Sequence, residues 1–528
     1  MKTAEDFRKS FGSPDESFTH TVMMTLNELN GCEEDGVPRE LTPQLIWSYE
    51  RREKTSGTKR KENAGKGKRF IRGGLVMAAC VVAVFLVVLQ TLKTPKNTPD
   101  QAVPLQQPRA AVTSLPEVYL TVDPEDLWNA ETGIFAEGDT INKAAIPYQN
   151  ALYKENGAIP RAFHVTVNNI YGETVMDADA FVSLPVSDFS VDMAQKPFIL
   201  TGNFNMEGQP EYKSFRLSNG GKDSVYTRIL NGYNTRLTET AGCSFMSLRW
   251  QPVSVYLNGE YWGHYNLSEN VDVATVAIHE NLDSTEGITV LQGKGILVDG
   301  SAEGKKEYEE LIRTVKTLDP ENNPEDLEYI RSEVDIDNYL EYVAMQMFVG
   351  NSDPSVFCCY RVPGGKWKWV WQNVDYGLFA SNYDSVKAYL KADGMGVQHI
   401  DNTLLLTLLK VPEYKTRFLN RLGEIFRTLT TEKMLETLEP IVAEITPEMQ
   451  RHFERWAAES ETVLNTLMPT EPRAALEYWN DRIERLRNTT RKRPTLFWEF
   501  IQENLALSEE DMENFFGPKP EMPADAIL

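Results

Sequence analysis

The sequence predicts an α+β protein in which a β-rich lobe is followed by a helical lobe, with one transmembrane helix ahead of both. Three observations lead to this prediction. Residues 115–269 contain short runs of β-branched and aromatic residues separated by turn residues, a pattern typical of strands. Residues 270–528 show mainly helical spacing of their apolar residues. Residues 73–92 carry no charge, and twenty such residues span a bilayer core as a helix of about 30 Å.

The charge changes sign on the N-terminal side of the uncharged segment. Residues 1–50 contain ten acidic and four basic residues, whereas residues 51–72 contain ten lysines and arginines and two glutamates. Basic residues beside a membrane helix favour the cytoplasmic side. We therefore expect residues 1–72 to be a cytoplasmic tail, residues 73–92 to cross the membrane once, and the large remainder to be extracytoplasmic. Apolar residues at helical spacing within residues 1–50 predict a docking element for a cytoplasmic partner.

Composition limits the remaining function classes. Residues 93–114 are rich in Pro, Thr, Gln and Ala without periodicity, so we expect a disordered linker. The net charge of −23 argues against nucleic acid as the main ligand, because nucleic-acid binding needs a basic face. The five cysteines give no disulfide framework. Cys358 and Cys359 are adjacent in a predicted strand, and we expect them to pack on its two opposite faces.

The clearest turn in the β-rich lobe is Asn258-Gly259. Residues 253–257 and 260–266 flank it as two runs with strand character. Asn-Gly is a preferred pair for the type I′ turn, because both residues tolerate positive φ. The sequence therefore predicts a tight antiparallel hairpin at this point.

Residues 335–379 are the stretch around which the helical lobe is organised. Apolar residues at helical spacing predict one buried helix face that ends at Gly350, where a residue free to adopt positive φ is expected; they are Ile336, Leu340, Val343 and Met347. Residues 357–362 and 366–372 follow as two strands of a hairpin. Trp367, Trp369 and Trp371 alternate along the second strand, so their indoles share one face.

Two aspartates lie at the two ends of this second hairpin, Asp353 before it and Asp375 after it. Phosphoryl transfer uses such a pair, because one carboxylate receives the proton of the attacking hydroxyl and another binds the metal on the phosphates. Asp375-Tyr376-Gly377 also has the form of the Asp-Phe-Gly element of protein kinases. The alternative is that both aspartates cap loop amides. Paired carboxylates between a β-rich and a helical lobe match a two-lobed, kinase-like layout.

Four separated motifs resemble the CotH kinase family, which is named for a bacterial spore-coat protein. They are residues 115–135, 256–269 (YLNGEYWGHYNLSE), 350–353 (GNSD) and 367–377. The resemblance covers about residues 115–420. It implies an atypical protein kinase fold that uses ATP with Mg²⁺ or Mn²⁺. The implied substrates are Ser or Thr residues of envelope or spore-coat proteins.

The resemblance also implies roles for individual residues. Asp353 matches the catalytic base and Asp375 the metal-binding aspartate. Lys196 matches the lysine that contacts the ATP phosphates. In an alternative register of the motif, Lys213 would take this role. The simpler interpretation of Lys196 is an ordinary solvated lysine on a strand. Glu269 matches a glutamate near the interlobe hinge, which we assign to cofactor binding; the alternative is a carboxylate on a turn.

Three polar positions depart from the family pattern and keep a second function class open. Ser355 and Val356 stand where the family has Gly-Asn, Asn373 where it has Asp, and Leu230-Asn231 where it has Arg-Asp. Valine cannot coordinate a metal. The first hypothesis is an active extracytoplasmic kinase. The second is a catalytically impaired pseudokinase that acts as a membrane-tethered assembly or binding module of the envelope or spore coat.

Overall fold

The computed structural model describes residues 111–136, 153, 158–185, 193–206, 210–351, 353, 357–391, 402–462 and 468–526. These residues belong to one compact unit of the chain. The expected cytoplasmic tail, the expected transmembrane helix at 73–92 and most of the expected linker lie outside the described residues. Within the described ranges, no helix is both long enough and apolar enough to span a bilayer.

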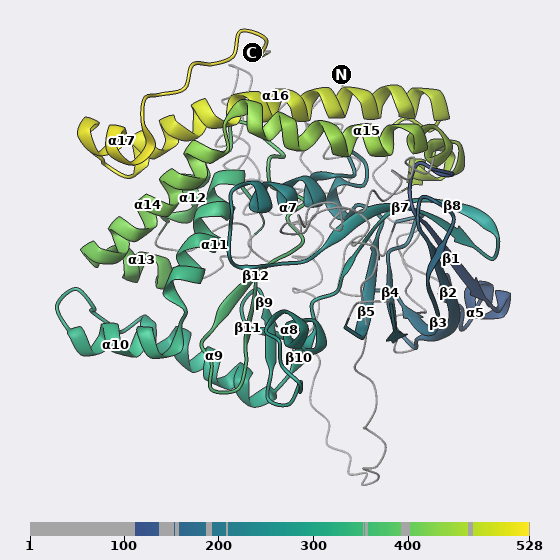
Figure 1. Ribbon diagram of the computed structural model, residues 1–528, viewed down its shortest axis with the longest axis horizontal. Helices are drawn as coiled ribbons and strands as arrows, with labels where there is room; N and C mark the ends of the chain where they lie inside the picture. Colours follow the sequence, from purple (N-terminus) through teal and green to yellow (C-terminus); the bar gives the residue numbers. More distant parts are fainter. Residues whose placement is uncertain are drawn as a thin grey trace, which may run out of the picture. The chain divides into compact units, whose positions relative to one another are not determined.

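The first part of the unit is a closed seven-stranded barrel with the strand order β1-β2-β3-β4-β5-β8-β7 (Figure 1). Its strands are β1 (Glu117–Val122), β2 (Arg161–Asn168), β3 (Thr174–Ser183), β4 (Phe198–Phe204), β5 (Tyr212–Ser218), β7 (Trp250–Leu257) and β8 (Glu260–Glu269). All neighbours are antiparallel except β1 and β7, whose parallel pairing closes the barrel. The sequence predicted a β-rich lobe of the kinase type, and the strands instead form a barrel.

The barrel is filled by one side of each strand. Along β1, for example, Val118, Leu120 and Val122 are buried and alternate with more accessible residues, the two-residue period of a strand with one face in a core. The predicted hairpin between β7 and β8 is confirmed, with φ of 49° at Asn258 and 83° at Gly259. The side chain of Asn258 also accepts a hydrogen bond of 2.8 Å from the Val122 amide, which fastens the turn to β1.

A second sheet of five strands lies in the C-terminal part, in the order β10-β9-β11-β12-β6. Its strands are β6 (Met246–Ser247), β9 (Thr289–Gln292), β10 (Ile296–Gly300), β11 (Cys358–Arg361) and β12 (Lys368–Trp371). The β11–β12 hairpin was predicted, whereas β9 and β10 were not, because residues 270–528 were assigned mainly to helices. β6 comes from the range expected to belong to the β-rich lobe, so the chain adds a strand to this sheet before it completes the barrel.

The two faces of this sheet belong to two different cores. Trp367, Trp369 and Trp371 all lie in the largest core, whereas Val370 lies in a smaller one on the other face. Cys359 and Cys358 divide in the same way, and both are buried. The expected alternation of the indoles and of the cysteines is therefore confirmed.

Helices cover the second sheet and extend beyond it. They are α7 (Leu230–Thr240), α8 (Val273–His279), α9 (Ala302–Val315), α10 (Pro324–Glu333), α11 (Ile336–Val349), α12 (Ser385–Tyr389), α13 (Thr403–Leu409), α14 (Pro412–Thr428), α15 (Thr431–Trp456), α16 (Pro472–Asn504) and α17 (Glu509–Phe516), and a short α5 (Pro124–Trp128) follows β1. The long helices α15 and α16 lie side by side (Figure 1). α15 also reaches the barrel, where the Trp456 indole donates a 2.7 Å hydrogen bond to the Trp262 carbonyl of β8.

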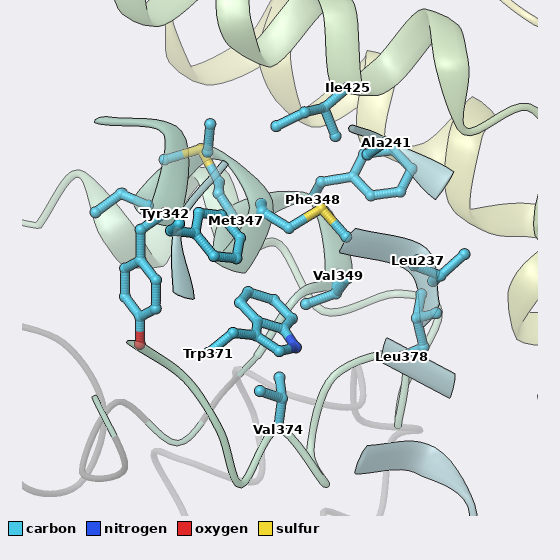
Figure 2. Packing of buried hydrophobic residues seen from close by; sticks show 14 of the residues in the cluster. Leu237, Ala241, Tyr342, Met347, Phe348, Val349, Trp371, Val374, Leu378 and Ile425 are labelled. Carbon is cyan, nitrogen blue, oxygen red and sulfur yellow. The ribbon is translucent and has the colours of Figure 1, made fainter. Parts of the chain in front are cut away.

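α11 is the central helix of the largest core. Apart from Asp337 and Asn338, its residues are buried, which exceeds the single apolar face that the sequence predicted. Figure 2 shows Trp371 of β12 packed among Val349 of α11 and Val374 of the following loop. The helix ends as predicted at Gly350, whose φ is 67°. The chain thus leaves a rigid helix immediately before Asp353.

Candidate functional site

Asp353 is positioned by the end of α11. Asn351 is fully buried, its side-chain oxygen accepts a 3.1 Å hydrogen bond from the Asp353 amide, and its side-chain nitrogen donates a 2.9 Å hydrogen bond to Gln346. The Tyr389 hydroxyl donates to the Asn351 carbonyl at 3.2 Å. This short stretch is therefore folded back on the helix, and the Asp353 carboxylate, although buried, projects away from it toward the barrel side, where its hydrogen-bond partner lies.

Arg493 of α16 supports the same helix end. Its guanidinium donates to the carbonyls of Phe348 at 2.6 Å and Met347 at 2.9 Å, and to the Ser385 hydroxyl at 2.7 Å. These carbonyls are the ones that an α-helix leaves without intrahelical partners at its C-terminus. Burial lowers the pKa of Arg493 to about 10, so it stays charged at neutral pH.

Asp375 is positioned by the loop after β12, which two asparagines of α7 hold. The Asn234 side chain donates to the carbonyls of Val374 at 2.8 Å and Gly377 at 2.9 Å. The side-chain oxygen of Asn231 accepts a 2.7 Å hydrogen bond from the Val374 amide. Asn231, one of the residues that depart from the expected pattern, thus takes part in holding this loop.

The two aspartates meet at a glycine turn that follows β5, Gly220-Gly221-Lys222. The Lys222 amide donates a 2.8 Å hydrogen bond to Oδ2 of Asp375, and the Lys222 ammonium forms an ion pair with Oδ2 of Asp353. Gly221 has a φ of 60°, and a Cβ atom there would lie 2.5 Å from Oδ2 of Asp375. Glycine is therefore required both for the conformation and for the close approach.

A third carboxylate, Asp223, fixes this turn from the inside. It accepts hydrogen bonds from the Thr227 amide at 2.9 Å, the Thr227 hydroxyl at 2.7 Å and the Leu230 amide at 2.9 Å. Because Leu230 begins α7, the turn and the helix that holds the Asp375 loop form one connected unit. Burial, and more weakly the charge of Asp375, raises the pKa of Asp223 to about 7.

Lys196 lies beside the glycine turn but not on a strand, since β4 begins at Phe198. It is 2% exposed, and its ammonium donates a 2.7 Å hydrogen bond to the Met193 carbonyl, so the interpretation as a solvated strand lysine is wrong. Asn219, which precedes the two glycines, donates a 2.7 Å hydrogen bond to the Gln195 carbonyl. The alternative residue, Lys213, instead contacts Asn203 and Glu211.

Glu269 occupies a different position, at the end of β8. Its side chain is fully buried and accepts a 2.8 Å hydrogen bond from the Arg249 amide, while Nε2 of His279 lies 3.1 Å from its Oε2. These contacts connect the barrel to α8. They do not bring Glu269 into the cluster of Asp353, Asp375 and Lys222.

Two cavities lie near these elements. One of about 40 Å³ lies behind the glycine turn and is lined by Gln195, Asn219, Arg228 and His452, among others. The larger, of about 510 Å³, is lined by Lys368, Arg417, Arg421, Asp337 and Glu341, among others. Asp337 lies at the first turn of α11 and Asp353 beyond its last. Fourteen helical residues separate the two ends by about 20 Å, so the larger cavity is distinct from the aspartate cluster.

The described residues do not fit the divalent metal that the resemblance implies. In the ranges that the structure covers, no group of three or more His, Cys, Asp or Glu residues could hold a metal ion. Asp353 and Asp375 each direct one oxygen to Lys222, which already provides a positive charge and an amide at this point. Val356 lies outside the described residues. A hard cation such as Mg²⁺ prefers several oxygen ligands in a near-octahedral shell.

By its fold and this cluster, the chain is an α+β protein whose acidic, lysine-containing site joins a barrel turn to loops of the second sheet. The family model described as CotH kinase protein matches residues 188–497. Because this match spans more than half of the chain, the chain belongs to the CotH kinase family. The matched range includes Lys196, Lys222, Asp353 and Asp375. No curated protein matches the chain.

Sequence reasoning missed Lys222, Asp223 and Arg493. The paired glycines before Lys222 were a usable signal, because two consecutive residues that tolerate positive φ commonly mark a close backbone approach. Arg493 gave no comparable signal, since basic residues surround it in the sequence and its burial depends on contacts about 145 positions away.

Proposed function

We propose that this chain is a kinase-like phosphotransferase that transfers the γ-phosphoryl group of ATP to a Ser or Thr hydroxyl of an envelope or spore-coat protein. The observation that supports it is the convergence of Asp353 and Asp375 on the Gly221-Lys222 turn, from positions 131 and 153 residues away. Membership of the CotH kinase family points to the same chemistry. In this proposal the barrel and the helical part correspond to the two lobes of an atypical kinase.

The proposed roles follow from position and charge. The new bond forms between the hydroxyl oxygen and the γ-phosphorus as the bond from that phosphorus to the β-phosphate bridge oxygen breaks. Asp353 accepts the hydroxyl proton. Lys222 provides positive charge toward the phosphates, and Lys196 would add to it by exchanging the Met193 carbonyl for a phosphate oxygen. Asp375 fixes the turn by accepting a hydrogen bond from the Lys222 amide, and it is the residue that the resemblance assigns to Mg²⁺ or Mn²⁺. No step here depends on that metal, because the described residues do not form its site.

One observation favours a second function, a pseudokinase that serves as a binding or assembly module. The Lys222 ammonium pairs with the carboxylate that would accept the proton. A carboxylate stabilised by an ammonium is a weaker base than an isolated one. If this pair persists when nucleotide binds, the chain binds ATP without transferring phosphate.

The test is transfer of radiolabelled γ-phosphate by the full chain, with Mg²⁺ and with Mn²⁺. We expect self-labelling by the wild type and by Asp283→Asn, an exposed control. Asp353→Asn should reduce it about 100-fold or more, the usual contribution of a general base. Melting temperatures and binding of an ATP analogue separate loss of chemistry from loss of fold. Unchanged labelling by Asp353→Asn would exclude its role as base, and binding without labelling by the wild type would favour the pseudokinase.

We also propose that residues 73–92 anchor the chain in a membrane, with residues 1–72 in the cytoplasm and the described unit outside. The support is the run of ten basic residues within residues 51–72, directly before an uncharged segment of twenty residues. Protease added to intact cells should digest the described unit and spare a tag at Met1. Protection of the unit under these conditions would reject the orientation.

A further inference from the structure

Lys222 contacts both aspartates of the site through different parts of the residue. Its main-chain amide binds Asp375 at 2.8 Å, and its ammonium binds Asp353. The Lys222 side chain is 14% exposed and that of Asp353 is 9% exposed, so the ion pair lies largely out of solvent. The ammonium also lies 4.9 Å from the centroid of the Tyr376 ring, within cation–π range. Lys222 thus contacts both carboxylates, that of Asp375 through its amide and that of Asp353 through its ammonium.

The backbone of Lys222 is held firmly by the residues on both sides of it. Gly220 and Gly221 adopt φ of 106° and 60°, and Asp223 anchors the other side of the turn with three hydrogen bonds. Four rotatable bonds separate the ammonium from this fixed backbone. The ammonium can therefore move from Asp353 to an incoming phosphate oxygen without disturbing the hydrogen bond that the Lys222 amide donates to Asp375.

The charge balance supports such an exchange. Asp353, Asp375 and Asp223 place three carboxyl groups around the turn, and burial raises the pKa of Asp223 to about 7, so that this group is partly neutral at physiological pH. An anionic phosphate entering this region needs a positive charge at the turn. Sites that recruit Mg²⁺ obtain it from the ion, which bridges carboxylates and phosphates. At this turn the same place between carboxylate and ligand is taken by an ammonium.

We propose that Lys222 is the resident cation of this site and that it lets the chain bind the phosphates of a nucleotide without a divalent metal. The inference rests on the proposed function for the identity of the ligand, and it concerns binding rather than transfer. A tethered ammonium supplies one positive charge at fixed reach. Removing it should make the site dependent on added metal, because the positive charge that the ammonium places beside Asp353 is then missing.

The experiment measures binding of ATP and of a non-hydrolysable analogue to the full chain by calorimetry, in EDTA and in Mg²⁺. The wild type should bind in EDTA within about threefold of its affinity in Mg²⁺. Lys222→Met should lose at least tenfold in EDTA and recover much of it in Mg²⁺. Lys222→Arg, which keeps the charge, should behave like the wild type. Lys306→Met, which removes an exposed lysine from an ion pair with Glu303, is the matched control and should change nothing.

A second measurement does not depend on nucleotide. Binding of Mn²⁺ alone, followed by electron paramagnetic resonance, should be at least tenfold tighter in Lys222→Met than in the wild type. The inference is overturned if the wild type binds nucleotide only with metal, if it binds no nucleotide at all, or if Lys222→Met binds Mn²⁺ no more tightly. Should Lys222→Met fail to fold, the wild type in EDTA and Lys222→Arg still decide. Absence of phosphoryl transfer would count against the proposed function only.

Discussion

The loops that carry Asp375 and Asp353 are held in different ways. The Asp375 loop is bound on both sides by asparagines of α7, and its carboxylate accepts a main-chain amide of the glycine turn. The Asp353 carboxylate reaches that turn through the long side chain of Lys222. A main-chain contact is fixed by the fold, whereas a lysine side chain can be withdrawn. The fold therefore makes the position of Asp375 permanent and leaves the contact of Asp353 exchangeable.

This difference suits the two proposed roles. A residue that orients the turn has to stay in place through a reaction cycle. A proton acceptor has to exchange one partner for another, first Lys222 and then the hydroxyl of a substrate. The Asp353 loop is accordingly stabilised mainly by the contacts of Gly350, Asn351 and Arg493 at the end of α11, and much less by the ion pair of the Asp353 carboxylate.

The largest effect is expected from Arg493→Ala, which removes the support beneath Asp353. The change leaves the carbonyls of Met347, Phe348 and Tyr383 and the Ser385 hydroxyl without their guanidinium donor. We expect a loss of about 3–5 kcal/mol in the free energy of unfolding, because several buried acceptors lose a charged donor and a cavity forms. Urea unfolding measures this. Arg485→Ala, in an exposed ion pair on the same helix, should cost less than about 1 kcal/mol.

Hydrogen exchange on Arg493→Ala sharpens the comparison between the loops. Amide protection should fall around Gly350 and remain near Asp375, since α7 rather than α16 holds the latter loop. Equal loss of protection in both loops would show that they are not independently supported.

An intermediate effect is expected from Asn234→Ala. Two buried carbonyls, those of Val374 and Gly377, lose their donor, at a cost of about 2–3 kcal/mol. Asn351→Ala should cost somewhat less, about 1–2 kcal/mol, because the loop that it supports is short. Chemical unfolding of both variants ranks them. If Asn351→Ala proved the more damaging, the Asp353 loop would be the more rigid of the two and the comparison would be reversed.

The last effect concerns pH, and it becomes as large as the effects above only when it is summed over several pH units. Burial raises the pKa of Asp223 to about 7 from an ordinary value of 3.8. The folded state therefore holds a proton that the unfolded state releases. The stability linked to this group is complete below about pH 4 and is lost as pH rises toward 7, by at most about 1.4 kcal/mol per pH unit.

Asp223→Asn should remove this dependence, so that its stability relative to the wild type improves between pH 5 and pH 8. Thermal unfolding across that range, beside the exposed control Asp283→Asn, measures the difference. Parallel pH profiles for the wild type and Asp223→Asn would mean that Asp223 is ionised throughout and stabilised by its three hydrogen bonds.

Local chemistry made part of this structure predictable. Gly350 ends α11 because only a residue that tolerates positive φ fits there, and Asn258-Gly259 turns a hairpin for the same reason. The alternation of Trp367, Trp369 and Trp371 is a property of any strand with one face in a core. Asp353 and Asp375 could be identified because they stand directly before and directly after one predicted hairpin.

Features that depend on distant contacts could not be derived in this way. Closure of the barrel requires β1 to pair in parallel with β7, more than a hundred residues later, and nothing in either strand specifies this partner. Lys222 itself gave no signal in the sequence, because its contacts with Asp353 and Asp375 span 131 and 153 residues. Lys196 was expected on a strand, but it lies before the strand begins at Phe198. Strand propensity also does not reveal that its ammonium is buried against the Met193 carbonyl.

The contact between Arg493 and the end of α11 also has a consequence in time. A ribosome completes α11 about 145 residues before it adds Arg493. Until then the carbonyls of Phe348 and Met347 lack their guanidinium donor, and the end of α11 lacks one of its supports. A chain is made from its N-terminus, and its parts fold as they emerge. The barrel and its glycine turn can therefore form before Arg493 is available to support the end of α11. The contacts that support the Asp353 side of the site are therefore complete only after synthesis has passed α16.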